Sequence, residues 1–394
     1  MRNTASFDLA GARLYTPSAV IEKGVLEVRE GRIHSVRTQE EWERSRDSGT
    51  AVRDAGGARV VPGFVDVHVH GGGGYDFMTG HDGSLEEIRL YHAAHGTTSL
   101  LATTVTAGRE PIAEAIRMIV REMKRGGPGA EVAGIHLEGP YLNPVRCGAQ
   151  NPENIRAADL DEIRAFWDLS EGTVRLVTLA PELEGGLEAT RFFRARGVTV
   201  SIGHSDASLA ETREAVREGA SHITHLFNGM RPFHHREPGL TGGALLLGEL
   251  TVEMICDGIH IHPEAVRYVW ETKPRDRIVF ITDSMGPAGL PDGTFRFEGM
   301  TAAMRDGILR LVQADGTEGS LAGSTLTMDK AMRNVMQWTG ASLEDVLPAL
   351  TLHPARQAGL AGRKGSLEAG KDADFVWLND DDTVAQTWVG GVRA

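Results

Sequence analysis

The chain has 394 residues, of which 41% are hydrophobic and 24% charged, and its formal net charge at pH 7 is −13. An acidic surface does not attract nucleic acid or an anionic membrane, so we expect neither as a partner. Its two cysteines provide neither a disulfide framework nor a cysteine-based zinc motif. The first residues lack an apolar signal segment, and no window approaches about 18 consecutive apolar residues, which predicts a cytoplasmic protein.

The two ends of the chain have similar patterns. Residues 1–60 contain alternating apolar runs broken by glycine and charged residues, which is typical of β hairpins. Residues 366–394 have the same pattern, with a clear strand at 374–378. We therefore predict one small β-sandwich domain that both termini form, from residues 1–60 and 360–394.

The middle of the chain alternates between strand-like and helix-like segments. Short β-rich runs recur from residue 64 onward, and the stretches between them, such as 111–124 and 209–218, have apolar residues at helical spacing. Eight such units predict the α/β class and a (β/α)8 TIM-like barrel over residues 61–359. A β-rich insertion at 292–312 follows the eighth run. The runs are 64–70, 97–106, 132–138, 174–180, 198–204, 223–228, 251–257 and 278–283.

Polar side chains with metal-binding chemistry stand at the carboxyl ends of these runs, where barrels of this class place their active sites. In the first run, His68 and His70 are two residues apart, so on a strand they project from the same face, roughly 7 Å apart. Two neutral imidazoles on one rigid element suit a divalent ion. Together with the later residues they predict one or two bound divalent ions, and one carboxylate left for proton transfer. The later runs supply Glu138, His204, His225 and Asp283.

Several motifs resemble those of a known family. The segment at 62–70, PGFVDVHVH, resembles the opening signature of the amidohydrolase superfamily. The motifs HLEGPYLNP, GHS, THLFN, REPG, DGIH and TDS follow in that order, and they are similar to those of N-acetylglucosamine-6-phosphate deacetylases. The closing segment at 365–374 also matches the superfamily, so the resemblance covers nearly the whole chain.

The resemblance implies metal-dependent hydrolysis of N-acetyl-D-glucosamine 6-phosphate to glucosamine 6-phosphate and acetate. Asp283 matches the catalytic acid and base of this family. Zinc is the metal that we expect first, with iron, manganese or cobalt as alternatives. Members of the family hold one ion at the first three of the positions named below, and some hold a second ion at the histidine pair that this chain also has, so one or two ions are expected. The implied metal ligands are Glu138, His204, His225, His68 and His70.

The resemblance also implies substrate contacts. Arg236 and His260 would bind the phosphate, because both offer hydrogen-bond donors, and in this family the arginine reaches across from a neighbouring subunit, which implies a homodimer. Many members have a histidine where this chain has Gln150, whose amide donates a hydrogen bond but carries no charge. That departure concerns either the polarisation of the amide carbonyl or the choice of acyl sugar. The implied contacts are Ala149, Gln150, Asn228, Gly229, Arg236, His260, Leu321, Ala322 and Gly323.

Three alternatives stay open. An N-acetylgalactosamine-6-phosphate deacetylase acts on a substrate that differs only in the configuration of one hydroxyl. A cyclic amidase of the same superfamily usually bridges its metals with a carbamylated lysine at the end of the fourth strand, where this chain has Leu-Ala-Pro at 179–181. A non-catalytic scaffold would have lost some of the ligands, and all of them are present.

Overall fold

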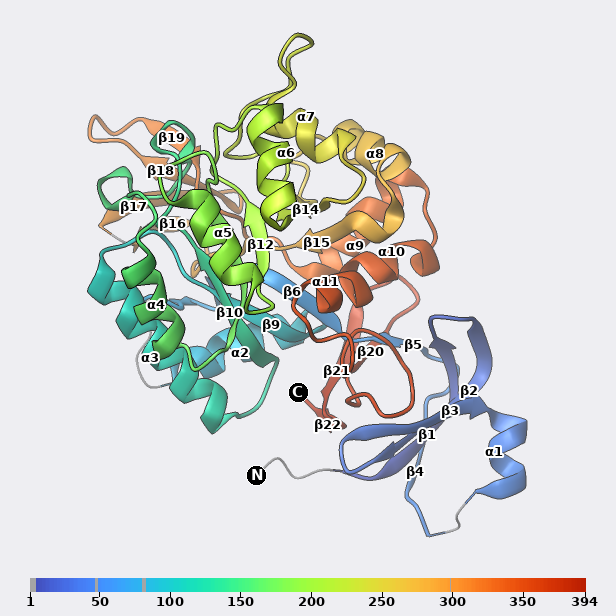
Figure 1. The fold of residues 1–394 in the computed structure, drawn as a ribbon. Coiled ribbons are helices and arrows are strands. Elements are labelled where there is room, and N and C mark those ends of the chain that lie inside the picture. Colours follow the sequence, from blue (N-terminus) through green and yellow to red (C-terminus); the bar gives the residue numbers. More distant parts are fainter. Residues whose placement is uncertain (1–4, 47–48, 80–82, 298) are drawn as a thin grey trace.

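An eight-stranded parallel sheet forms the centre of the computed structural model, which describes residues 5–46, 49–79, 83–297 and 299–394. The strands lie side by side in chain order, and helices cover the outside of the sheet (Figure 1). This confirms the predicted α/β alternation. The strands are β6 (Phe64–Val69), β9 (Thr97–Thr103), β10 (Glu131–Glu138), β11 (Val174–Leu179), β12 (Thr199–Ile202), β13 (Ala220–Ile223), β14 (Thr251–Ile255) and β15 (Ile278–Ile281).

The covering helices mostly alternate with these strands along the chain. Two of them fall where the apolar spacing predicts a helix, namely α3 and α6. Three further helices follow the eighth strand; all three contact β15, and the last two also contact β6. The helices are α2 (Ser84–Ala94), α3 (Arg109–Arg125), α4 (Leu160–Leu169), α5 (Gly186–Arg194), α6 (Leu209–Glu218), α7 (Gly239–Leu246), α8 (Pro263–Thr272), α9 (Met328–Thr339), α10 (Leu343–Leu350) and α11 (Leu352–Gln357).

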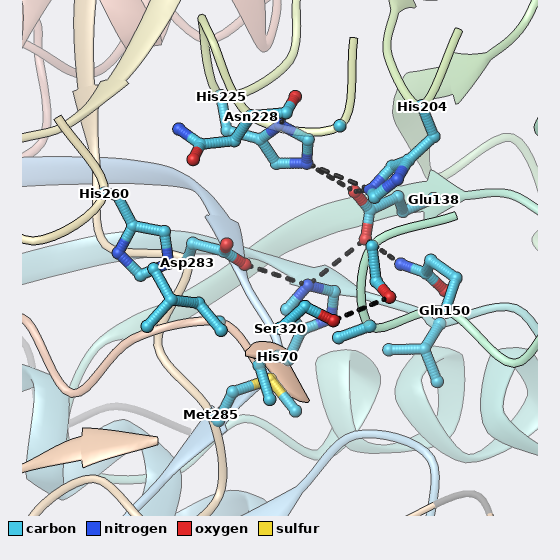
Figure 2. A pocket seen from close by; sticks show the side chains of 17 residues that line it. His70, Glu138, Gln150, His204, His225, Asn228, His260, Asp283, Met285 and Ser320 are labelled. Carbon is cyan, nitrogen blue, oxygen red and sulfur yellow. Dashed lines mark hydrogen bonds and ion pairs between the residues drawn. The ribbon is translucent and has the colours of Figure 1, made fainter. Parts of the chain in front are cut away.

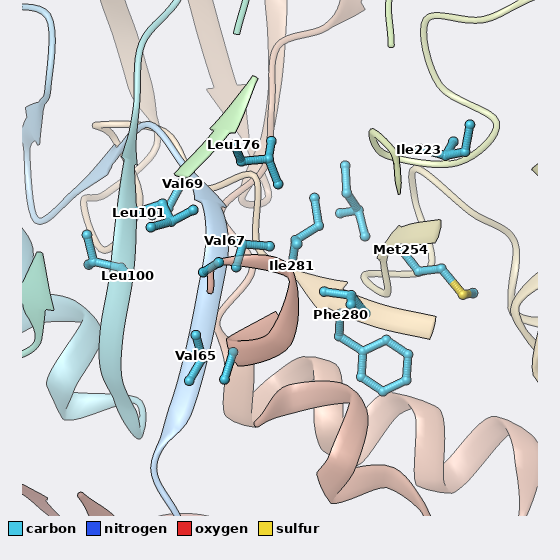
Figure 3. Packing of buried hydrophobic residues seen from close by; sticks show 14 of the residues in the cluster. Val65, Val67, Val69, Leu100, Leu101, Leu176, Ile223, Met254, Phe280 and Ile281 are labelled. Atoms are coloured by element: carbon cyan, nitrogen blue, oxygen red, sulfur yellow. The ribbon is translucent and has the colours of Figure 1, made fainter. Parts of the chain in front are cut away.

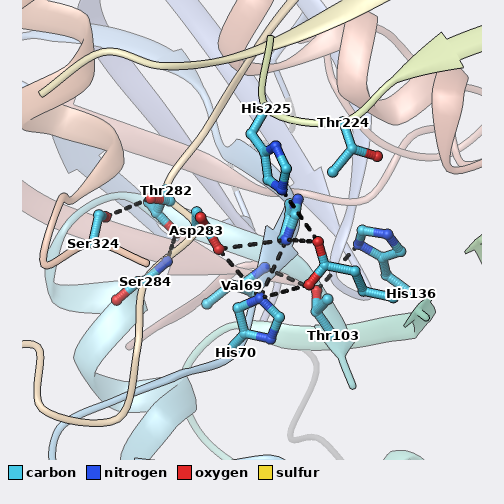
Figure 4. Close-up of polar contacts among 12 residues, drawn as sticks. Val69, His70, Thr103, His136, Thr224, His225, Thr282, Asp283, Ser284 and Ser324 are labelled. Carbon is cyan, nitrogen blue, oxygen red and sulfur yellow. Dashed lines mark hydrogen bonds and ion pairs between the residues drawn. The ribbon is translucent and has the colours of Figure 1, made fainter. Parts of the chain in front are cut away.

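The sheet curls until its two edge strands meet. At the carboxyl end of β6, the backbone N–H of Asp283 donates to the carbonyl of His68 at 2.9 Å, and the N–H of His70 donates to the carbonyl of Ser284 at 2.9 Å. These bonds join the first strand to the segment that follows the last strand. Residues that are more than 200 positions apart therefore lie side by side (Figure 4).

Alternation along β6 separates an apolar face from a polar face. Val65, Val67 and Val69 are at most 1% exposed and belong to the main hydrophobic cluster, beside Leu100 and Leu101 of β9 (Figure 3). Burying each valine stabilises the fold by about 1.5–3 kcal/mol. Because the valines occupy the apolar face, the histidines that alternate with them project from the opposite face, as the spacing predicts.

The sixth strand is shorter than predicted, and the expectation that His225 lies on it is wrong. β13 ends at Ile223, and His225 follows in a loop. The φ angles of His225 and Phe227 are 28° and 77°, which a β-strand does not adopt, so the chain turns immediately after β13. The turn keeps the ring of His225 near the barrel mouth although it is no longer part of the strand.

Both ends of the chain contribute to a second, mixed sheet, which confirms that the termini associate. Phe375 pairs with Pro62, and the ring of Phe375 stacks on Trp388 at 5.4 Å between centroids. These strands form one continuous sheet; its description as a sandwich stays a prediction. The strands are β1 (Phe7–Tyr15), β2 (Val20–Arg29), β3 (Arg32–Thr38), β4 (Val52–Asp54), β5 (Arg59–Pro62), β20 (Phe375–Leu378), β21 (Val384–Val389) and β22 (Val392–Arg393), with helix α1 (Gln39–Ser45).

The predicted β-rich insertion is a four-stranded antiparallel sheet at the mouth of the barrel. Met304 and Leu309 from this sheet pack with Met285, which follows β15, and with Ala149. Among the described residues, no helix combines the length and the apolar character that crossing a bilayer would need. The strands are β16 (Gly293–Phe297), β17 (Met300–Arg305), β18 (Ile308–Val312) and β19 (Glu318–Leu321), and a short hairpin consists of β7 (Gly71–Gly72) and β8 (Tyr75–Asp76).

Candidate active site

A cavity of about 220 Å³ opens at the carboxyl ends of the barrel strands (Figure 2). It collects residues from many separate segments of the chain, and most of the predicted site residues line it. His68 lies behind the cavity wall and is 0% exposed. The predicted residues in the lining are His70, Glu138, Ala149, Gln150, His204, His225, Asn228, Gly229, His260, Asp283, Leu321, Ala322 and Gly323.

One candidate metal-binding cluster consists of Glu138, His204 and His225, all buried. The Nε2 atoms of His204 and His225 lie 3.2 and 3.3 Å from Oε1 of Glu138, and 3.1 Å from each other. Three nitrogen and oxygen donors that converge in this way match the ligand set of a zinc-type ion.

A second cluster consists of His68, His70 and Asp283. Figure 4 shows His70 and Asp283 facing each other. The two Nε2 atoms are 3.2 Å apart, and they lie 3.4 and 3.2 Å from Oδ1 of Asp283. Glu138 stands between the clusters, because its Oε2 is 3.3 Å from Nε2 of His70 while its Oε1 faces the first cluster. One carboxylate therefore reaches both clusters.

The orientation of the imidazole rings fits a bound cation. The Nδ1 atoms of His204 and His225 face the backbone carbonyls of Arg146 and Asn228 at 2.9 and 3.1 Å. A carbonyl only accepts, so each Nδ1 carries the proton, and in the neutral ring Nε2 is left with a lone pair. Two lone pairs that face each other across 3.1 Å repel one another unless a proton or a metal ion binds them, and Oε1 of Glu138 is a buried acceptor with no hydrogen-bond partner among the described residues.

The charges of the clusters compensate one another. Burial opposes the ionisation of Glu138 and Asp283, but electrostatic attraction from the surrounding histidines, His68 first, outweighs it and holds the pKa of both carboxyls below the usual range. Burial also opposes protonation of His70, but hydrogen bonds with Asp283 and Glu138 raise its pKa to about 9. The site therefore stabilises added positive charge, which a divalent ion supplies.

Three of these side chains depend on an unusual backbone conformation. The φ angles of His204, His225 and Asp283 are 47°, 28° and 51°, a region that residues other than glycine rarely adopt. Each such residue costs on the order of 1–3 kcal/mol, and such residues cluster at functional sites. The strained turns direct all three side chains into the cavity directly after their strands end.

Gln150 lines the cavity, and both ends of its amide form hydrogen bonds within the protein (Figure 2). Its Nε2 donates to Oε2 of Glu138 at 2.7 Å, and its Oε1 accepts the backbone N–H of Thr106 at 2.7 Å. The amide therefore orients Glu138 in this structure. Its predicted part in polarising a substrate carbonyl stays a prediction.

Arg236 is the predicted contact that the structure leaves outside the cavity. It is exposed on the segment between β13 and α7, and its Nη1 contacts Nε2 of the adjacent His235 at 2.9 Å. Within the described part of the chain, no lysine or arginine lines the cavity. His260 does line it, and its Nδ1 is held by Oδ2 of Asp257 at 2.6 Å.

Sequence reasoning missed a buried acid beside these clusters. Glu253, in the middle of β14, contacts His68 at 2.9 Å and His222 at 3.0 Å. A signal was present, since a glutamate inside the apolar run TVEMIC is unusual for a buried strand.

The comparisons with known proteins agree with this geometry. The model of the Amidohydrolase family matches residues 59–394. The chain belongs to the amidohydrolase family. It is 41% identical over 335 residues to N-acetylgalactosamine-6-phosphate deacetylase of Escherichia coli O157:H7, covering 85% of this chain and 87% of the relative. It is 37% identical over 378 residues to N-acetylglucosamine-6-phosphate deacetylase of Bacillus subtilis, covering 95% and 93%.

A solved structure of the family is similar over nearly its whole length. It is an N-acetyl-D-glucosamine-6-phosphate deacetylase of Mycobacterium smegmatis, an aspartate-to-alanine variant in complex with N-acetyl-D-glucosamine-6-phosphate. The TM-score is 0.89 at 36% identity, and the match covers 99% of both chains. The fold and the family of this chain are therefore those of its deacetylase relatives.

Proposed function

We propose that this protein hydrolyses the N-acetyl group of N-acetyl-D-glucosamine 6-phosphate to glucosamine 6-phosphate and acetate. The observation that carries the proposal is the pair of adjoining cation-binding clusters that share Glu138 and open into one cavity with Asp283. The names of the B. subtilis and M. smegmatis relatives support the substrate. The name of the E. coli relative keeps the galacto epimer as the alternative.

Asp283 is the proposed acid and base. A bound divalent ion would polarise the amide carbonyl and lower the pKa of a water molecule. The pKa of Asp283 is held below its usual range by the neighbouring His68 and His70 against the opposing effect of burial, so its carboxylate can accept a proton from the water as the oxygen attacks the carbonyl carbon. The carbon–nitrogen bond then breaks, and Asp283 returns the proton to the leaving nitrogen, which departs as a neutral amine. The two products share the atoms of substrate and water without any further reactant.

The proposed metal arrangement has two ions. Glu138, His204 and His225 would hold one, and His68, His70 and Asp283 the other, with Glu138 able to bridge them. Histidine and carboxylate ligands suit zinc first, and iron, manganese or cobalt as alternatives. Measuring bound metal by mass spectrometry after dialysis tests both the number of ions and their identity.

A homodimer would complete the phosphate site. The cavity is lined by His260 but by no lysine or arginine of the described residues, and a phosphate dianion needs a cation. The exposed Arg236 of a second copy is the proposed donor. Lys330, which lines a smaller hollow next to His260, is the intrachain competitor.

Complementation between two inactive variants separates these donors. Arg236→Ala and Asp283→Asn are each expected to abolish most turnover as homodimers. When both are co-expressed, a heterodimer regains one complete site only if the arginine acts across the interface, so about a quarter of the wild-type activity returns after random pairing. No recovery, or a loss in Lys330→Ala equal to that in Arg236→Ala, would contradict the intersubunit assignment.

Acetate release tests the reaction itself. Protein loaded with defined metal is given N-acetylglucosamine 6-phosphate, its galacto epimer and unphosphorylated N-acetylglucosamine. We expect turnover of the first substrate that requires both metal and phosphate. A higher kcat/KM for the galacto epimer would select the alternative, and no turnover with metal bound would contradict the deacetylase proposal.

The division of the chain is also a proposal. Residues 1–60 with 360–394 would form the small β domain, and residues 61–359 the barrel. Two separate hydrophobic clusters support it, because one gathers Phe7, Val60 and Phe375 while the other fills the barrel. A cytoplasmic location is part of the proposal, and cell fractionation tests it.

A further inference from the structure

A buried carboxylate stands directly behind the second metal-binding cluster. The side chain of Glu253 is 0% exposed, as are those of its strand neighbours Val252 and Met254. Removing a carboxylate from water costs several kcal/mol unless it is hydrogen-bonded, so an apolar side chain would fill this position at lower cost. The contacts of Glu253 indicate what the charge does there.

Three N–H groups surround this carboxylate. Its Oε2 accepts from Nδ1 of His68 at 2.9 Å and from the backbone N–H of His225 at 3.1 Å. Its Oε1 accepts from Nε2 of His222 at 3.0 Å. A carboxylate that accepts two or three N–H hydrogen bonds is favoured in its ionised form, and Glu253 accepts three.

The contact with Glu253 determines which nitrogen of His68 faces the cluster. An ionised carboxylate only accepts, so Nδ1 of His68 carries a proton. Nε2 is then the ring atom that faces Nε2 of His70 at 3.2 Å and Oδ1 of Asp283 at 3.4 Å. A carboxylate behind a ligating histidine fixes the ring and increases the basicity of the nitrogen that binds the metal.

The other histidines of the clusters lack such a partner. Nδ1 of His204 and of His225 each face a neutral backbone carbonyl. Nδ1 of His70 is buried with no hydrogen-bond partner among the residues that the structure describes. His68 and His70 belong to the same cluster. In that cluster, Nδ1 of His70 has no partner, whereas Nδ1 of His68 has a charged one.

We propose that Glu253 is a positioning residue for the ion of the His68–His70–Asp283 cluster. It holds the ring of His68 and strengthens Nε2 as a ligand, so that this ion binds more tightly than it would next to a neutral group. His222 holds the carboxylate from the other side. The proposal rests on the two-ion arrangement proposed above and extends it to the affinity of one ion.

Glu253→Gln tests the charge with little change in shape. The amide oxygen can still accept from Nδ1 of His68 and from the N–H of His225, and the new NH2 group can donate to Nε2 of His222. The proton of His222 then moves to Nδ1, which faces Oε1 of Gln357 at 3.2 Å. The variant therefore removes the charge but keeps every hydrogen bond.

The measurement is zinc binding by the metal-stripped full-length protein, using calorimetry and the metal content after dialysis. We expect two ions in the wild type. In Glu253→Gln, one ion should bind as before while the other weakens by about 10- to 100-fold. His70→Ala, which removes a ligand of the same cluster, identifies the weakened ion. Glu162→Gln is the matched control, because this buried carboxylate contacts Tyr141 and Arg156 instead of a metal cluster.

Equal weakening of both ions, or no change in either, would overturn the proposal, and so would a wild type that binds only one ion. Should Glu253→Gln fail to fold, His222→Gln loosens the carboxylate without removing its charge, and the same ion should weaken to a smaller degree. Acetate release is measured in parallel. A failure there with normal zinc binding would count against the proposed reaction and leave the role of Glu253 in metal binding intact.

Discussion

Replacing Gln150 with leucine should destabilise the metal-free protein, because the amide makes two buried hydrogen bonds. The bond to the ionised Glu138 is worth about 1.5–3 kcal/mol, and leaving the N–H of Thr106 unpaired costs about 1–3 kcal/mol. Burying the leucine side chain stabilises the folded state by about 1.5–3 kcal/mol, which offsets part of this loss. The net expected loss in the free energy of unfolding is about 1–3 kcal/mol.

Urea unfolding of metal-stripped Gln150→Leu measures this loss. Gln337→Leu is the matched control, because Gln337 is exposed on α9 and its replacement should change the free energy of unfolding by less than about 0.5 kcal/mol. A Gln150→Leu variant as stable as this control would refute the reasoning. It would show that the two short hydrogen bonds contribute nothing net to the folded state.

Three further predictions concern the site and its surroundings. Asp283→Asn should lower kcat by about 10²- to 10⁴-fold because the proton acceptor is lost; near-wild-type turnover would exclude the proposed role. Chelation should lower the melting temperature, since an ion that binds only the folded state stabilises it, and an unchanged melting curve would contradict a structural contribution. Burial opposes ionisation of Glu131, but the hydrogen bond from Arg363 and the charge of Lys364 outweigh it and lower the pKa of Glu131 from 4.5 to about 2. The stabilisation, about 3 kcal/mol, is therefore present above pH 4.5 and lost as the pH falls towards 2. Urea midpoints at pH 6 and pH 3 measure it, and Glu131→Gln should flatten this difference.

Local patterns predicted the strands and most of the site. Each barrel strand is a short buried run, and the apolar residues of α3 and α6 recur at helical spacing. The local sequence of each element was therefore sufficient to predict it. The site residues sit next to strand ends, which a parallel barrel brings to one mouth whatever its other details. That is why the sequence predicted that Glu138, His204 and Asp283 converge, and the structure places all three in one cavity.

The remaining features depend on contacts that the order of residues does not reveal. The residues after Ile223 remain typical of a strand, yet the positive φ of His225 ends it, and the backbone N–H of His225 is held by Glu253, which lies far away in the sequence. Glu253 acts through His68, which is 185 positions away in the chain. The proposed role of Arg236 involves a second copy of the chain, and no local pattern within one chain describes such an interface.

The sheet shared by both termini has a consequence for synthesis on the ribosome. β5 ends at Pro62, and its partner β20 begins at Phe375, so about 310 residues must be translated before this edge is covered. At about 5–20 residues per second, the nascent chain exposes an unpaired strand edge for about 15–60 s. An unpaired edge is a template for pairing with other chains. Nascent chains that stall before β20 are therefore expected to aggregate through β5, even when every residue of the barrel has already been made.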